Sequence, residues 1–275
     1  MKHLLVFDMD ETFLLPDKTI SADNRKALEK LQKHDILYTI ASGRSPFMIG
    51  RYIDELSVSI PVISCNGGLI SGTDLTTIIW ENPIHNDLLK HVFAHLANFT
   101  SSMDVLAYST TKVYYSKYST RIEAFRQYNA SSPDHRKAPL FPLTPEVMLG
   151  EEDAFIKILL YSPTPEQEEY LRSLEGLEVV SSGANFLDIM QKGSTKGNAV
   201  LALANHLDIP IGNVAVFGDN ENDISMFRSG ALSVAMGNSQ DFVKAEAQYV
   251  TATNIQSGVA QAIEKYVLPT FGYID

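Results

Sequence analysis

The stretch Leu4-Leu5-Val6-Phe7-Asp8-Met9-Asp10-Glu11-Thr12 joins a short apolar run to a pair of acidic residues. An uninterrupted apolar run of this kind is typical of a strand that is buried on both faces of a parallel sheet. Ligands of open parallel sheets bind beyond the carboxyl ends of the strands, which is where Asp8 and Asp10 would stand. The two acids lie two residues apart on an extended segment, so both can turn toward one site. Taken alone, the same residues would suit an ordinary polar turn equally well.

Short apolar runs alternate with helical patterns in the first and last thirds of the chain. Ser21 can cap a helix whose apolar positions recur at helical spacing, and Pro46 suits the first turn of another helix. Further strands are expected at 4–7, 36–41, 61–64, 214–217, 232–235 and 249–250, and further helices at 195–206, 221–228 and 255–267. Strands that alternate with helices imply a parallel sheet with right-handed crossovers.

The middle of the chain, roughly residues 82–188, follows a different pattern. Its tyrosine-rich, half-polar segments suit antiparallel strands with one face in water. The expected elements are a helix face over 88–96, strands at 105–108, 112–115 and 155–161, a helix at 165–174 and a loop at 131–145. We therefore predict an α/β protein whose Rossmann-like parallel-sheet core, residues 1–82 and 189–275, is split by an inserted α+β domain, residues 83–188.

Composition narrows the class of protein. The chain has 275 residues and a net charge of −11, with 45% hydrophobic residues, which is an ordinary globular mixture. The acidic balance argues against nucleic-acid partners and against an anionic membrane surface. No apolar stretch approaches the roughly 18 residues of a membrane helix, and the N-terminus does not resemble a secretory signal. The single cysteine, Cys65, is expected to be a small core residue, and a cytoplasmic location suits it.

A second acidic cluster follows another apolar run. Asp219 and Asp223 stand in Phe217-Gly218-Asp219-Asn220-Glu221-Asn222-Asp223, and each alone could simply cap a helix or face solvent. If the two acidic strand ends are neighbours, three or four carboxylates converge there. Two unit charges about 4 Å apart repel by about 4 kcal/mol at an effective dielectric constant near 20. Such a cluster requires a cation or a bound proton, and oxygen ligands of this kind suit Mg²⁺.

Groups that suit a phosphate come from two further places. Ser42-Gly43-Arg44 follows the second predicted strand, and Lys196 opens a predicted helix after Gly193-Ser194-Thr195. A hydroxyl, backbone amides, a lysine and a helix N-terminus are common phosphate ligands. Each part alone has a simpler interpretation, because Ser42-Gly43 would suit a turn and most lysines are solvated. The histidine pair His91 and His95, by contrast, lacks further metal ligands and indicates only a polar helix face.

In this order the motifs resemble those of the haloacid dehalogenase (HAD) superfamily, and specifically its Cof-type subfamily IIB phosphatases. Asp8-x-Asp10-x-Thr12 is similar to the first family motif and Ser42-Gly43-Arg44 to the second. Lys196 matches the third, and Gly218-Asp219-x-x-Asn222-Asp223 matches the fourth. The resemblance spans most of the chain, with an insertion between the second and third motifs. Glu11 departs from the pattern, because the family usually has glycine in this tight turn.

The resemblance implies roles for the matched residues. Asp8 would attack phosphorus to form an aspartyl-phosphate, and Asp10 would protonate the leaving oxygen and then deprotonate water. Thr12 would orient the loop. Mg²⁺ would be held by Asp8, the Asp10 backbone carbonyl and Asp219, with support from Asp223 directly or through water. The phosphate would be bound by four residues of the later motifs, namely Ser42, Gly43, Lys196 and Asn222.

The inserted domain would then be a type C2B cap that closes over the site and contacts the leaving group. Arg44, Asn66 and Asn185 are candidate substrate contacts, although a plain turn residue is the simpler interpretation of the two asparagines. Asp188 shares that ambiguity. Cap tyrosines such as Tyr114 and Tyr115 could stack on a ring, but half-buried strand residues explain them more simply.

The implied function is Mg²⁺-dependent hydrolysis of small organic phosphomonoesters. Sugar phosphates are the expected substrate class, with pyridoxal phosphate and flavin mononucleotide as further ones. A phosphotransferase or phosphomutase would use the same aspartyl-phosphate and stays open as an alternative. A non-catalytic phosphate sensor is disfavoured because binding alone needs no nucleophile and acid pair, and a dehalogenase because it needs no metal-binding carboxylates. The expected partner is a small phosphorylated metabolite, and the expected state a monomer or weak homo-oligomer.

Overall fold

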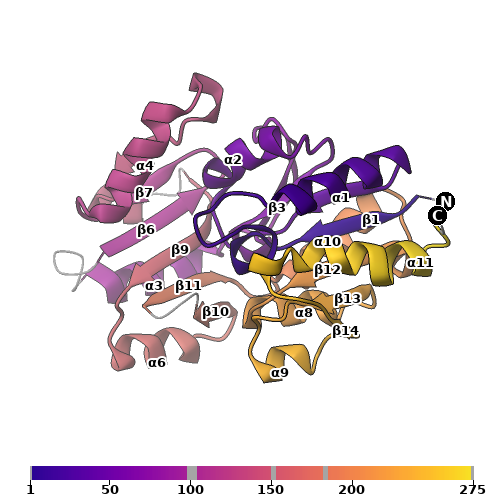
Figure 1. Cartoon of the computed structure of the whole chain (residues 1–275). Helices are drawn as coiled ribbons and strands as arrows, with labels where there is room; N and C mark the ends of the chain where they lie inside the picture. The colour runs from indigo at the N-terminus through magenta and orange to yellow at the C-terminus, as the bar shows by residue number, and fades with distance from the viewer. Residues whose placement is uncertain (1, 98–103, 150–152, 182–184, 274–275) are drawn as a thin grey trace.

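A five-stranded parallel sheet forms the core of the protein in the computed structural model, which describes residues 2–97, 104–149, 153–181 and 185–273 (Figure 1). The strand order is β14-β13-β12-β1-β2. The strands are β1 (Leu4–Phe7), β2 (Leu37–Ile40), β12 (Val214–Gly218), β13 (Leu232–Ala235) and β14 (Tyr249–Val250). Phe7 pairs in register with Phe217 and with Ile40. The residues that follow β1, β12 and β2 therefore leave the sheet side by side.

Helices cover both faces of this sheet, as the fully apolar strand β1 predicts. Leu5 and Phe7 pack into one core, and Leu4 and Val6 pack into a second core on the opposite face. The first core is covered by α1 (Ala22–Lys33), α2 (Pro46–Glu55) and α10 (Gly258–Ala262), and the second by α7 (Lys196–His206) and α8 (Ile224–Phe227). Ser21 caps α1 as expected, because its side chain accepts a hydrogen bond from the Asn24 backbone. The predicted parallel α/β core is confirmed.

The predicted third parallel strand pairs differently from the expectation. β3 (Val62–Ser64) pairs antiparallel with β4 (Leu69–Ser71), which in turn pairs antiparallel with β5 (Ile78–Glu81). β3 meets the end of β2 through one parallel bridge, between Ala41 and Ile63. The cause is the turn after β3, where Cys65 and Asn66 both adopt left-handed backbone angles and reverse the chain.

A six-stranded sheet in the order β10-β11-β9-β6-β7-β8 forms the inserted α+β domain. Its strands are β6 (Asp104–Ser109), β7 (Val113–Tyr115), β8 (Leu140–Pro142), β9 (Phe155–Tyr161), β10 (Leu177–Ser181) and β11 (Phe186–Gln191). All pairs are antiparallel except β7 with β8. Its helices are α3 (Asn86–Ala97), α4 (Thr120–Ser131), α5 (Pro145–Leu149) and α6 (Pro165–Ser173). The boundaries at residues 82 and 188 stay predictions, and β11 runs across the second of them.

Two expectations for the inserted domain were wrong. The strands were expected to have one wet face, yet every residue of β6 is buried. The reason is that α3 and α6 cover one face of the sheet while α4 and Phe47 of α2 cover the other. The expected loop at 131–145 contains a 3₁₀ turn at Asp134–Arg136 and the strand β8. Arg136 in that turn pairs with Asp54 of α2 at 2.6 Å, which ties the inserted domain to the core.

Two predicted helices are shorter or interrupted. The segment expected to be helical over 221–228 is a 3₁₀ turn at Glu221–Asp223 followed by α8, because Asn220 and Asp223 form a capping box at its start. The closing helix is divided into α10, a π-helical turn at Ile263–Val267 and α11 (Leu268–Thr270), and a short helix α9 (Asp241–Lys244) precedes β14. Ser257, in a left-handed conformation, sets the start of α10. Within the described residues, no helix is long and apolar enough to cross a membrane.

Candidate active site

A buried ion-pair group lies at the carboxyl ends of β1 and β12. The Asp8 amide donates to the Phe217 carbonyl at 2.9 Å, which fixes Asp8 directly after the strand. Lys196 Nζ donates to Asp8 Oδ1 at 2.5 Å and to Asp223 Oδ1 at 2.7 Å. Lys196 is the first residue of α7 and is 1% exposed, so the interpretation as a solvated lysine does not hold. Thr195 caps the same helix and fixes where the lysine leaves the backbone.

The loop after β12 is shaped around Asp223. Its Oδ2 accepts hydrogen bonds from the backbone amides of Asp219, at 2.9 Å, and Asn220, at 3.0 Å. A Cβ atom added at Gly218 would lie 2.4 Å from the Asp223 side chain, so a larger residue at position 218 would displace it. Thr12 Oγ1 donates to Asp219 Oδ1 at 2.7 Å, which joins the first motif to the fourth. Thr12 therefore orients Asp219.

The carboxylates of Asp8, Asp219 and Asp223 converge closely enough to share a cation. One oxygen from each lies within 4.8 Å of the others, while Lys196 contributes a single ammonium group to the same group of charges. Burial raises the pKa of Asp8 well above its usual range. Burial, followed by repulsion from Asp223, raises the pKa of Asp219 to about 7. The site is short of positive charge, and its hard oxygen donors suit Mg²⁺.

Asp10 is turned away from this group toward two cations. It accepts from Arg44 Nε at 2.7 Å and Nη2 at 2.6 Å, and Lys18 Nζ lies 2.9 Å from Asp10 Oδ1. Burial works against ionisation of Asp10, but the hydrogen bonds and charges of Arg44 and Lys18 outweigh it and lower the pKa to about 2. Asp10 is therefore ionised in this arrangement, with its side chain outside the close carboxylate group.

Glu11 adopts a backbone conformation that is unusual for any residue except glycine. Its φ angle is 58°, in the left-handed region that favours glycine. The Glu11 backbone carbonyl accepts from Asn238 Nδ2 at 2.8 Å, and its carboxylate lies 3.3 Å from Asn254 Nδ2. These contacts to the loop after β13 and the turn before α10 hold the strained residue in place.

The loop after β2 lies against the same site. Ser42 is buried, and its Oγ accepts from the Arg44 backbone amide at 3.1 Å. A Cβ atom at Gly43 would lie 2.7 Å from Asn66 Oδ1, so a larger residue at position 43 would displace the Asn66 side chain. Asn66 also accepts from Asn222 Nδ2 at 3.0 Å and donates to Asp188 Oδ2 at 2.8 Å. Asn66 thus connects the phosphate-binding candidates to the inserted domain.

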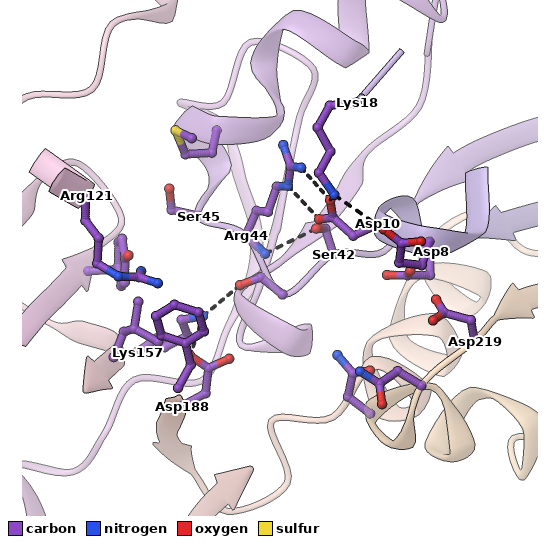
Figure 2. A pocket seen from close by; sticks show the side chains of 18 of the residues that line it. Asp8, Asp10, Lys18, Ser42, Arg44, Ser45, Arg121, Lys157, Asp188 and Asp219 are labelled. Carbon is purple, nitrogen blue, oxygen red and sulfur yellow. Dashed lines mark hydrogen bonds and ion pairs between the residues drawn. The ribbon is translucent and has the colours of Figure 1, made fainter. Parts of the chain in front are cut away.

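A cavity of about 530 Å³ opens between the core and the inserted domain (Figure 2). Its core side is lined by Asp8, Asp10, Glu11, Lys18, Ser42, Gly43, Arg44, Ser45, Met48, Asp219, Asn220 and Asn222. Its other side is lined by Tyr108, Arg121, Phe125, Lys157, Leu159, Phe186 and Asp188. Figure 2 shows Asp8 and Asp219 at one end and Arg121, Lys157 and Asp188 at the other.

Most of the predicted site residues surround this cavity. Lys196 lies beneath it and binds both Asp8 and Asp223, and Asn66 lies beside it, bound to Asn222. The structure does not bring Asn185 to the site, because this exposed residue forms the turn before β11 and its carbonyl accepts from the Ser162 amide at 2.8 Å.

Sequence reasoning missed several residues that line the cavity. Lys157 lies inside an apolar strand and was not predicted as a site residue. A charged residue in such a strand does indicate a buried polar partner, because buried charges require partners. Lys157 Nζ lies 2.8 Å from Asp188 Oδ1 and donates to the Gly43 carbonyl at 2.7 Å. Lys18 and Arg121 carry no comparable signal, since one lies in a turn and the other on a helix of mixed polarity.

Other residues considered from the sequence lie away from the chemistry. Tyr114 is buried in the cap sheet, beside Phe155 and Phe141. Cys65 is buried, and burial raises the pKa of its thiol to about 11. His91 contacts the Asp87 carbonyl on its own helix and His95 stacks on Tyr170, so neither belongs to the acidic group.

Known proteins resemble this chain over most of its length. A family model described as haloacid dehalogenase-like hydrolase matches residues 5–263. The 5-amino-6-(5-phospho-D-ribitylamino)uracil phosphatase of Bacillus subtilis is 28% identical over 269 residues, covering 96% of each chain. The pyridoxal phosphate phosphatase of Escherichia coli is 26% identical, covering 97% of this chain and 99% of its own. The resemblance to Cof-type hydrolases, inferred from the four motifs, is confirmed.

The fold agrees with a solved structure over nearly all of the chain. The structure of a haloacid dehalogenase-like hydrolase from B. subtilis superposes with a TM-score of 0.81 at 24% identity. The superposition covers 96% of this chain and 99% of the other. The parallel core and the antiparallel cap thus occur together in a known architecture.

Proposed function

We propose that this chain, which belongs to the haloacid dehalogenase-like hydrolase family, is a Mg²⁺-dependent phosphatase of small organic phosphomonoesters. The observation that carries the proposal is the buried contact of Lys196 with Asp8 and Asp223, beside Asp219 and below the cavity. A nucleophilic carboxylate, a fixed ammonium group and a cation-seeking acidic cluster are the parts that phosphoryl transfer requires. The names of the relatives, both phosphatases of small phosphorylated compounds, support the same activity.

Asp8 is the proposed nucleophile. Lys196 Nζ holds its Oδ1, which leaves the second carboxylate oxygen to attack phosphorus. A bond forms between that oxygen and phosphorus while the bond to the ester oxygen breaks, and the product is an aspartyl-phosphate and an alcohol. The ammonium group of Lys196 offsets the negative charge that spreads over the transferring group.

Asp10 is the proposed acid and base. It gives a proton to the leaving oxygen in the first step and takes one from water in the second, when water displaces Asp8 from phosphorus. Arg44 and Lys18 keep Asp10 ionised in the structure. A bound phosphate dianion would compete for both cations and raise the pKa of Asp10, which favours the protonated form that the first step needs.

The acidic cluster fits Mg²⁺, as its close oxygens and single ammonium partner indicate. Asp8, Asp219 and the Asp10 backbone carbonyl would hold the ion. Asp223 would keep the Asp219 loop in place, because Lys196 and two backbone amides already engage its oxygens. When bound, the ion would supply positive charge that offsets the repulsion of the nucleophile and the phosphoryl group. Ser42, Gly43 and Asn222 complete the proposed phosphate-binding set.

The decisive experiment compares p-nitrophenyl phosphate hydrolysis in the wild type and in Asp8→Asn, with Mg²⁺ present. We expect a fall in kcat of at least about 10⁴-fold, because the nucleophile is lost. Asp17→Asn is the matched control, since Asp17 is exposed and its hydrogen bonds among the described residues go to Thr19. Undiminished turnover in Asp8→Asn would sink the mechanism.

Two further measurements define the reaction. Asp10→Asn should slow hydrolysis of a sugar phosphate more than that of p-nitrophenyl phosphate, because a poor leaving group depends more on protonation. Inorganic phosphate and alcohol should appear in equal amounts even with a free hexose present. A deficit of phosphate, matched by a new phosphorylated sugar, would identify a phosphotransferase instead.

A further inference from the structure

The half of the cavity farthest from Asp8 is mostly apolar. Its walls include the side chains of Tyr108, Phe125, Leu159 and Phe186, together with Met48 from the core. Ligand sites of this kind bind the apolar body of a ligand through their walls and orient it through a few polar groups. The polar groups at this end are therefore the ones that select the leaving group.

Two of the three charged groups at this end are already paired with each other. Lys157 Nζ lies 2.8 Å from Asp188 Oδ1 and donates to the Gly43 carbonyl, while Asp188 Oδ2 accepts from Asn66. Both side chains are almost completely buried, at 5% and 1% exposure. Their charges cancel and their polar atoms are engaged within the protein, so neither is a strong candidate for recognising a charged substrate group.

Arg121 differs from that pair. It stands in the first turn of α4, is half-buried, and reaches the cavity wall opposite Asp8 (Figure 2). Within residues 2–97, 104–149, 153–181 and 185–273, its guanidinium group has no hydrogen-bond or ion-pair partner. It is held instead by rings, lying 3.6 Å from the centroid of Phe186 and 5.5 Å from that of Tyr161. Stacking restrains the plane of the group and leaves its N–H donors uncommitted.

The position of Arg121 on its helix also favours the binding of an anion. The first turn of α4 carries the positive end of the helix dipole, so a cation placed there is locally unfavourable and a negative ligand would relieve it. A planar guanidinium matches a two-oxygen acceptor in particular. We infer that Arg121 is a specificity-determining residue that binds a carboxylate on the leaving group, at the end remote from the phosphate. This inference rests on the proposed phosphatase function.

The test uses phenyl phosphate and its 3- and 4-carboxy derivatives, which share the reacting group and differ in the acid. In the wild type we expect kcat/KM to be roughly 10- to 100-fold higher for the better carboxylated ester, as a charge-assisted hydrogen bond provides. Most of the difference should lie in KM. Arg121→Met should remove the preference, and Arg121→Lys should retain part of it, because the charge remains without the planar fork.

The matched control is Arg126→Met. Arg126 lies on the same helix but is exposed and over Tyr118, outside the cavity, so the preference should stay unchanged. A wild type without preference for either carboxylated ester would overturn the inference, as would a preference that survives in Arg121→Met. In both cases Asp8-dependent hydrolysis of phenyl phosphate would leave the proposed function standing.

A binding measurement gives the answer without turnover. Calorimetry with phenylphosphonate and its 3- and 4-carboxy derivatives should show the same 10- to 100-fold preference, lost in Arg121→Met. If that preference is present while no ester is hydrolysed, the proposed function fails and the carboxylate site remains. Equal affinities for all three phosphonates would overturn the carboxylate site whatever the enzyme hydrolyses.

Discussion

Two buried lysines lie on opposite sides of the cavity, Lys157 in its wall and Lys196 beneath Asp8, and their surroundings differ in charge balance. Lys196, from the core, meets Asp8 and Asp223 with Asp219 close by, so three carboxylates share one ammonium group. Lys157, from the cap, pairs with one carboxylate, that of Asp188, which also accepts from Asn66. The first group carries excess negative charge and the second is neutral.

The difference indicates what each group can do. A balanced buried pair is a structural connection, because its polar atoms are satisfied without outside help. An unbalanced group remains poised to bind a cation and to react. Burial, together with repulsion between the neighbouring carboxylates, raises the pKa of Asp8 and of Asp219. Buried lysines of similar exposure thus serve chemistry on one side of the cavity and attachment of the cap on the other.

Replacement of Lys196 should have the largest effect. Lys196→Met keeps most of the side-chain volume but leaves Asp8 and Asp223 without their ammonium partner, so kcat/KM should fall by about 10³-fold. Thermal unfolding with and without Mg²⁺ should accompany the steady-state assay. A variant that unfolds at the wild-type temperature and retains a tenth of the activity would contradict the unbalanced-group interpretation.

Removal of the metal should have the second largest effect, and it should act on the Lys196 group and not on the Lys157 group. Chelation of Mg²⁺ should reduce activity by at least about 100-fold, reversibly, because only the core group lacks positive charge. Since the pKa of Asp219 is about 7 without metal, protons compete with Mg²⁺ below that pH, and the affinity should weaken as pH falls from 8 to 6. Calorimetric titration at both pH values measures this, and pH-independent affinity would contradict it.

Replacement of Lys157 should have a smaller effect on activity and a clear effect on stability. Lys157→Met leaves Asp188 buried without its cation, which should lower the free energy of unfolding by roughly 3 kcal/mol. Loss of the contact to the Gly43 carbonyl should reduce kcat/KM by roughly 10-fold. The double variant Lys157→Met/Asp188→Leu should recover part of the stability in urea titrations. A double variant less stable than the single one would show that the pair does more than balance charge.

Glu11→Gly should have the smallest effect. Glycine accepts the left-handed angle of 58° freely, so the free energy of unfolding should rise by up to about 1 kcal/mol, less what the contact with Asn254 contributes. Activity should stay within about twofold, since Glu11 is not among the close carboxylates. Urea unfolding and the p-nitrophenyl phosphate assay check both expectations, and a tenfold loss of activity would assign Glu11 a direct role.

The core was more predictable from sequence than the cap, for physical reasons. Strands buried on both faces leave continuous apolar runs, so Leu4–Phe7 and Leu232–Ala235 were located to the residue. In the cap, Val105 to Tyr108 seemed half-polar because of its tyrosine, but α4 buries that side chain, a contact that local sequence does not reveal. The antiparallel pairing of β3 likewise depends on backbone angles at Cys65 and Asn66 that neither residue type dictates.

The site divides in the same way. Asp8, Lys196, Asp219 and Asp223 stand in recognisable motifs at strand and helix ends, and the structure brings them together. Arg121, Lys157 and Phe186 approach the cavity only through the packing of the cap onto the core. Residues that select a substrate therefore cannot be placed until the tertiary arrangement is known.

The strand β11 has a consequence for exchanging caps between related enzymes. It ends at Gln191 in the cap sheet, and Lys196 begins α7 after only the short connection 192–195. Displacement of that strand would pull on the amine that holds Asp8. A transplanted cap therefore has to match the host in the length and exit direction of this connection, and grafts designed on the opposite connection alone should lose catalysis even when they fold.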